Sequence, residues 1–244
     1  MQRRPISRRT AIAGGALVLS GLTLRKANAA ALQFNPVSVS MAPGQNSSSI
    51  DVTNTGTEPA TLQVRGFRWS QQGNEDKLDP TTDLIVSPPQ FTVAAGQTQT
   101  VRILSRDQNQ QNERTFRILV DELPRPQANT VAFALRVSLP VVQESAVKGK
   151  PVLNWSMERQ ADGQTHLIAR NSGDRMVRFV KLDIAQGQTP LTAQMQSPSP
   201  YALPGGERRW IVRNGDKPFA GSGEFRVAVE TQQLPRIETS VAIR

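Results

Sequence analysis

The chain has 244 residues, no cysteine and a formal net charge of +9. The lack of cysteine excludes disulfides, thiolate metal sites and a cysteine nucleophile. Six of the 29 basic residues and no acidic residue lie within residues 1–29, so the rest of the chain carries a net charge of only +3. A nucleic-acid-binding domain would keep a basic surface on its folded part, so this distribution argues against nucleic acid as a partner.

The first element along the chain is predicted to be an export signal. The basic start MQRRPISRR precedes the 14-residue apolar stretch AIAGGALVLSGLTL, and the small residues Ala27 and Ala29 predict cleavage before Ala30. Ser7-Arg8-Arg9-Thr10 is similar to a twin-arginine signal, and both this route and the general export route stay open. The stretch is too short to span a bilayer, and no later segment is apolar enough. We therefore expect a periplasmic protein without an integral membrane segment.

After this signal, short alternating runs separated by Gly, Pro, Asn and Asp favour β-strands. The N-terminal half contains the runs SSIDVTNTG, TLQVRGFRW, FTVAAGQTQTVRIL, RTFRILVDELP and VAFALRVSLPV. Beyond residue 151 the runs are VLNWSM, THLIARNSG, RFVKLDI, RRWIVRN, EFRVAVE and SVAIR. No stretch sustains a helical period with caps. The pattern predicts an all-β fold of sandwich domains.

A polar break at residues 143–150 separates two strand-rich halves of ordinary domain size. We therefore expect a signal at 1–29, a first β-sandwich domain at 30–142, a linker at 143–150 and a second sandwich domain at 151–244. Within the first domain, the polar segment Gln71–Thr82 is predicted to be a hairpin loop.

Residues that usually carry catalysis or metal binding are scarce. His166 is the only histidine, and neither a GxSxG elbow nor a phosphate-binding GxxxxGK[ST] loop is present. Asp121 and Glu122 are adjacent on a predicted strand, so their side chains point to opposite faces. We predict no catalytic residue, no metal and no cofactor. Because catalytic triads assemble from distant residues, a secreted sandwich hydrolase stays open as an alternative.

The run VAFALRVSLPV at 131–141 alternates with period two, which indicates a strand with one apolar face. The residues of that face are Val131, Phe133, Leu135, Val137 and Leu139. Two interpretations follow from the pattern alone. The face can cover the core of its own domain, or it can be offered to another chain.

Five stretches in register resemble the PapD-like family of periplasmic pilus-assembly chaperones, and their sequences are most similar to its non-classical branch. They are SMAPGQNSSSIDVTNTG, FRWSQ, SPPQFTVAAGQTQTVRIL, ERTFRILVDELP and VAFALRVSLPV. IARNSGDRMVRF and YALPGGERRWIV in the second half match more loosely. The resemblance implies two immunoglobulin-like β-sandwich domains set at an angle.

The resemblance also implies a use for the alternating face. In this family the last strand of the first domain, called G1, completes a pilus subunit that lacks a strand, by strand addition. The five apolar residues of 131–141 would then be the subunit-binding residues. The implied partners are pilus subunits and an outer-membrane usher. An unloaded chaperone would protect this edge by self-association or by folding down the loop Glu122–Thr130.

Two positions that carry a positive charge in the family hold uncharged residues in this chain. Relatives anchor the subunit's C-terminal carboxylate with an arginine and a lysine whose places here hold Ser38 and Pro140. The candidate anchors are therefore other cations, in the order Arg117, Arg136 and Arg114. Strand parity points Arg136 away from the donor face.

Another family position predicts a contact between the domains. Glu113 matches an acid that joins an interdomain ion-pair network, but the place of its usual basic partner holds Glu144. On sequence grounds this network therefore lacks its positive charge.

Taken together, these features predict a chaperone of chaperone–usher pilus biogenesis and no enzyme. A structural pilus subunit is the alternative from another class. A subunit would carry a separate donor extension, whereas AALQFNPVSV runs directly into the first predicted strand.

Overall fold

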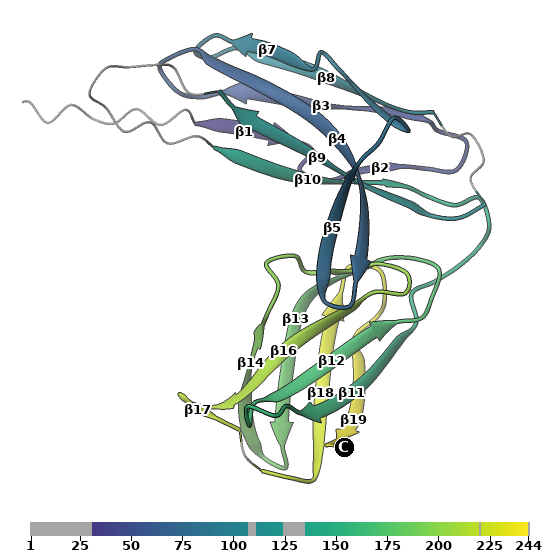
Figure 1. Ribbon diagram of the computed structural model, residues 1–244, viewed down its shortest axis with the longest axis vertical. Helices are drawn as coiled ribbons and strands as arrows, with labels where there is room; N and C mark the ends of the chain where they lie inside the picture. Colours follow the sequence, from purple (N-terminus) through teal and green to yellow (C-terminus); the bar gives the residue numbers. More distant parts are fainter. Residues whose placement is uncertain (1–30, 107–110, 124–134, 220, 244) are drawn as a thin grey trace, which may run out of the picture.

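The computed structural model describes residues 31–106, 111–123, 135–219 and 221–243. These residues form β-strands and no α-helix, which confirms the all-β prediction. Figure 1 shows two β-domains set at an angle, the first above the second. The predicted export signal, Val131, Phe133 and most of the loop Glu122–Thr130 lie outside the described residues.

The first domain is a sandwich of two sheets. One sheet has the order β1-β3-β8-β6, and the other has the order β2-β10-β9-β4-β5, with β7 paired to β4. The strands are β1 (Leu32–Asn35), β2 (Val39–Met41), β3 (Ser47–Asn54), β4 (Ala60–Gln72), β5 (Glu75–Pro80), β6 (Leu84–Ser87), β7 (Gln90–Val93), β8 (Thr98–Ser105), β9 (Arg114–Glu122) and β10 (Arg136–Gln143).

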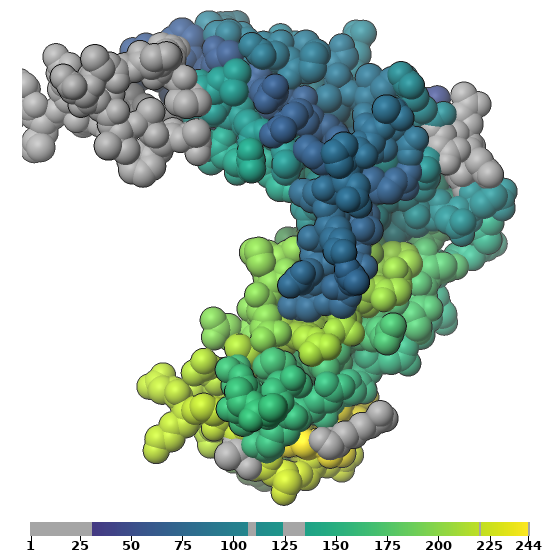
Figure 2. Space-filling view, viewed as in Figure 1, coloured from purple at the N-terminus to yellow at the C-terminus, as the bar shows by residue number. Residues whose placement is uncertain are grey.

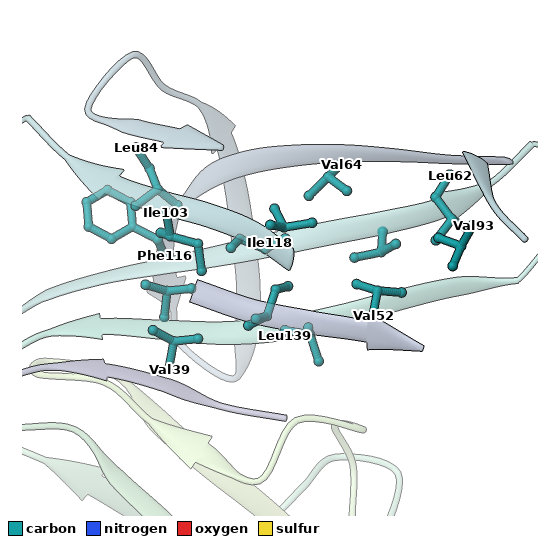
Figure 3. Packing of buried hydrophobic residues seen from close by; sticks show 14 of the residues in the cluster. Val39, Val52, Leu62, Val64, Leu84, Val93, Ile103, Phe116, Ile118 and Leu139 are labelled. Atoms are coloured by element: carbon teal, nitrogen blue, oxygen red, sulfur yellow. The ribbon is translucent and has the colours of Figure 1, made fainter. Parts of the chain in front are cut away.

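Apolar side chains at every second position fill the space between these two sheets. On β9, Phe116, Ile118 and Val120 are buried against residues of β3 and β8 on the facing sheet. Figure 3 shows how these side chains interdigitate between the ribbons, and Leu139 of β10 lies among them. Each fully buried aliphatic or aromatic side chain stabilises the fold by about 1.5–3 kcal/mol, so this alternation holds the sandwich together.

The first two described strands belong to different sheets of the first domain. β1 pairs with β3 in one sheet, whereas β2 runs parallel to the end of β10 in the other. The β2 contact covers only Val141–Gln143. Among the described residues, β9 is therefore the only strand that pairs with β10 over residues 136–140. Within the described part of the chain, residues 136–140 are therefore an open sheet edge.

The second domain is one nine-stranded sheet folded over its own core. Its main order is β11-β12-β16-β14-β13-β18-β19, with β15 paired to β13 and β17 to β16. A parallel bridge between Met157 and Ile243 joins β11 to the end of the chain. The strands are β11 (Leu153–Arg159), β12 (Thr165–Asn171), β13 (Val177–Gln186), β14 (Thr189–Met195), β15 (Tyr201–Ala202), β16 (Glu207–Asn214), β17 (Lys217–Pro218), β18 (Glu224–Thr231) and β19 (Ile237–Ala242).

One feature departs from the sequence prediction. Most of Gln71–Thr82 is strand and not loop, because β5 pairs with residues 67–72 of β4 and only two residues form the turn. This hairpin has no apolar alternation because it leaves the sandwich and covers no core. Figure 1 shows it reaching down from the first domain to the second, and Figure 2 shows its tip seated against the second domain.

The burial of β10 predicts unequal effects of two substitutions on the same face. Leu139→Ala is expected to lower the free energy of unfolding by about 2–5 kcal/mol, because it leaves a cavity in the core. Leu135→Ala is expected to change it by about 0.5 kcal/mol or less, because Leu135 is exposed. Urea denaturation of both purified variants measures the difference. Equal effects would contradict this assignment of the two residues.

Candidate functional site

Strand β10 divides its apolar face between the domain core and the surface. Leu139 is 4% exposed and belongs to the core, and Val137 is partly buried against that core. Leu135, just before the strand, is 39% exposed. The apolar face therefore leaves the core towards the N-terminal end of the strand. The core interpretation therefore holds for Leu139 and in part for Val137, whereas Leu135 lies at the surface.

The opposite face of β10 carries Arg136, as strand parity predicts. Arg136 lies opposite Asp121 in the ladder and donates a hydrogen bond to Asp121 Oδ1, while Arg65 Nη2 lies 2.6 Å from Oδ2. Burial by itself would raise the pKa of the Asp121 carboxyl, but the hydrogen bonds from Arg136 and Arg65 outweigh it and lower the pKa. These bonds hold the beginning of β10 in register on β9.

Arg117 lies at the point where the two domains meet. It stands directly opposite Pro140 and is 8% exposed. Its guanidinium carbon is 3.8 Å from the centroid of the Trp69 ring, a cation–π contact. Its Nη2 donates a hydrogen bond of 3.0 Å to Ser199 Oγ of the second domain and is 3.7 Å from Asp76.

The third predicted anchor, Arg114, lies on the other face of the same strand. Its Nη2 is 3.3 Å from Asp83 Oδ2, and Asp83 also accepts a hydrogen bond from Arg68. Side chains three positions apart on a strand point to opposite faces, so Arg114 and Arg117 do not act on one ligand. The structure therefore brings Arg117 to the junction of the domains and leaves Arg114 and Arg136 elsewhere.

Five apolar side chains from both domains form a separate cluster around Arg117, which we call the interdomain cluster. Its members are Trp69, Val142, Met176, Tyr201 and Leu203. Trp69 and Tyr201 meet edge to face, with ring centroids 5.4 Å apart. Val142 comes from β10, on the face opposite Leu139. The candidate donor strand therefore also forms part of the contact between domains.

Glu113 contacts the second domain, and its basic partner there was not identified from the sequence. Its Oε1 accepts a hydrogen bond of 2.6 Å from the Met176 backbone N–H, and its Oε2 is 3.9 Å from Arg175 Nη1. Burial raises the pKa of the Glu113 carboxyl, although the Met176 hydrogen bond and Arg175 oppose that rise. The positive charge comes from the second domain, whereas Glu144 accepts a hydrogen bond from Ser40.

Two other residues at this junction were not singled out by sequence reasoning. Asp76 of the hairpin accepts a hydrogen bond from Arg208, which is fully buried on β16. More than 130 positions separate these partners, and in the sequence each has the pattern of an ordinary charged residue on a strand. No local pattern in the chain identifies such a pair.

The described part of the chain contains no group of three or more metal-binding side chains of the His, Cys, Asp and Glu types. The lone His166 is buried on β12, and its Nε2 is 3.4 Å from Gln196 Nε2. Within the same described ranges, the structure has no helix with the length and apolar character needed to cross a membrane.

Several solved structures share this fold. A chain in the CsuC–CsuE chaperone–tip adhesion subunit pre-assembly complex of Acinetobacter baumannii matches with a TM-score of 0.67 and 21% identity, over 88% of this chain and 100% of that one. The YadV chaperone matches with a TM-score of 0.60 and 18% identity, over 86% and 98%. The Escherichia coli chaperone DraB matches with a TM-score of 0.57 and 19% identity, over 86% and 98%. At these identities the likeness shows the two-domain sandwich fold.

No curated protein sequence matches the chain. The family model that matches is that of the pili and flagellar-assembly chaperone, PapD N-terminal domain, over residues 31–144. This span holds both sheets of the first domain, including all of β10. The first domain, residues 31–144, is therefore a PapD-type N-terminal domain of the pili and flagellar-assembly chaperone family.

Proposed function

We propose that this chain is a periplasmic chaperone that binds pilus subunits by donating β10 and then passes them to an outer-membrane usher. The observation that carries the proposal is the state of β10. No second described strand pairs with its edge over residues 136–140, and its apolar face emerges from the core at Leu135. A subunit that lacks one strand can pair its backbone along this edge and receive the exposed side chains in its groove.

The donor residues then have different tasks. Leu135 and Val137, with Val131 and Phe133 earlier in the chain, enter the subunit, while Leu139 mainly holds β10 in its own domain. Each side chain that is fully transferred from water into the groove contributes about 1.5–3 kcal/mol. Much of this gain offsets the entropy of association and of ordering the subunit. Release then needs a competing strand and no nucleotide.

Arg117 is the proposed anchor for the subunit's C-terminal carboxylate. It stands opposite Pro140, where relatives place a lysine, and it faces the second domain. Arg117, Arg208 and Asp76 together bring two positive charges and one negative charge to the junction. A carboxylate at Arg117 would balance the excess through charge-assisted hydrogen bonds. Arg136 and Arg114 already meet Asp121 and Asp83.

The solved neighbours support the class of partner. One of them is a chaperone bound to a tip adhesion subunit, and another is the Salmonella enterica SafB chaperone with the SafA pilin, which matches with a TM-score of 0.58. The family match of the first domain supports delivery to an usher, and the basic, apolar start of the chain supports export to the periplasm.

Leu135→Glu is expected to abolish subunit capture without unfolding the protein, because it places a charge in the apolar groove of the subunit. Ser138→Glu is the matched control, since Ser138 is exposed on the opposite face of β10. Tagged proteins are purified from native periplasm, and mass spectrometry identifies what each retains. The proposal fails if Leu135→Glu keeps the subunit that wild type captures.

Arg117→Ala is expected to weaken binding of the captured subunit about 10- to 100-fold, since a charge-assisted hydrogen bond contributes about 1.5–3 kcal/mol. A subunit extended by two glycines, which displaces its carboxylate, should bind wild type more weakly but Arg117→Ala no more weakly than before. Arg102→Ala, at an exposed position of β8, is the control. If the extension weakens binding to Arg117→Ala as much as to wild type, another group anchors the carboxylate.

A further inference from the structure

The tip of the β4–β5 hairpin is held by the second domain through its backbone and side chains. Gln71 donates through Nε2 to the Tyr201 carbonyl at 2.8 Å and accepts the Leu203 N–H through Oε1 at 2.9 Å. Asn74 accepts the Arg209 N–H through its side-chain oxygen at 3.1 Å. The hairpin thus bonds to both β15 and β16, although it belongs to the first domain.

The fit at this contact is close. A Cβ atom built on Gly206 would lie 2.0 Å from the side-chain oxygen of Gln71, far inside van der Waals contact. Gly206 immediately precedes β16, so the second domain is shaped to admit the hairpin at this point. Because glycine has no side chain, the hairpin and the second domain can approach to hydrogen-bonding distance here.

Arg208 is the buried charge on which the contact is built. It is 0% exposed, and its Nε donates to the Ser199 carbonyl at 2.8 Å within its own domain. Its Nη1 donates to the Asn74 carbonyl at 2.9 Å, and its Nη2 donates to the Asp76 carboxylate. Two of its partners therefore come from the hairpin of the other domain. If the domains parted, this guanidinium would lose its counter-charge.

Asp76 stands between one guanidinium from each domain. Arg208 of the second domain bonds to its Oδ1, and Arg117 of the first domain is 3.7 Å from its Oδ2. Burial lowers the pKa of both arginines, and the charge of Asp76 counteracts this effect. Without the carboxylate, two buried positive charges would repel each other, and breaking a buried pair in this way is strongly unfavourable.

We propose that residues 71–76 form a brace that sets the angle between the two domains, and that Asp76 is its positioning residue. The alternative is that contacts near the linker alone set this angle. There, Arg175 pairs with Glu113 and donates hydrogen bonds to the backbone carbonyls of Ser145 and Val147. The brace lies on a different strand pair from these contacts. Its role does not depend on whether a pilus subunit binds.

The chain has no cysteine, so two introduced cysteines can carry spin labels without background. Ala95→Cys in the first domain and Ser240→Cys in the second replace small, exposed residues. Double electron–electron resonance on the full chain then measures the distance distribution between the domains. Asp76→Asn is expected to shift and broaden this distribution, because the domains separate at the brace. Asp76→Glu, which keeps the charge, is expected to recover much of the wild-type width.

Two further variants make the test specific. Asp79→Asn lies on the same strand at an exposed position and is expected to leave the distribution unchanged. Gln71→Ala removes two hydrogen bonds to the second domain and one to Asp76 Oδ1, but it keeps the Asp76 carboxylate between its two arginines, so it tests the brace even if Asp76→Asn does not fold. It should broaden the distribution less than Asp76→Asn. If Gln71→Ala and every folded Asp76 variant match wild type, while Glu113→Gln broadens the distribution, the linker side sets the angle and the proposal is wrong.

Discussion

The structure depends on how strand β10 divides its side chains among three environments. Leu139 and Val141 fill the core of the first domain, and Val142 on the other face packs in the interdomain cluster. Leu135 is exposed beside an edge that β2 leaves open. A strand anchored at one end by two hydrophobic contacts can present its other end to a partner without losing its place in the sheet. Donation of this strand is therefore compatible with the stability of the domain that carries it.

The junction between the domains combines apolar packing with paired charges. Five apolar side chains exclude water, and two separate ion-pair sites, Glu113–Arg175 and Asp76 with its two arginines, lie at the junction. Charges in such a place are tolerated only when they are paired and hydrogen-bonded, so they specify how the two surfaces must meet. A purely apolar contact would tolerate sliding, because the hydrophobic effect has no direction. The charged pairs supply the direction that a defined angle requires.

Much of the fold follows from local patterns, and much of the site does not. Alternation along 48–56, 61–69 and 114–124 identified strands that the structure contains, because an antiparallel sandwich buries every second side chain. Gln71–Thr82 was predicted as a hairpin loop; the hairpin is present, but most of the segment is strand, because strands outside the core have no apolar alternation to reveal them. Period two placed Leu135, Val137 and Leu139 on one face, yet it could not tell exposed Leu135 from buried Leu139. That difference depends on where the facing sheet ends.

The sequence by itself determined the all-β class, the common face of the β10 residues and the outward direction of Arg136, since each follows from backbone geometry over a few neighbouring residues. Only the tertiary structure decided which cations meet at the junction. Arg117 and Arg208 converge on Asp76 because a hairpin of one domain reaches a strand of the other. Arg175 replaces the missing partner of Glu113 because the two domains also meet on the linker side. Charge pairing acts through space, and partners that lie tens of positions apart or more leave no trace in the local pattern of the chain.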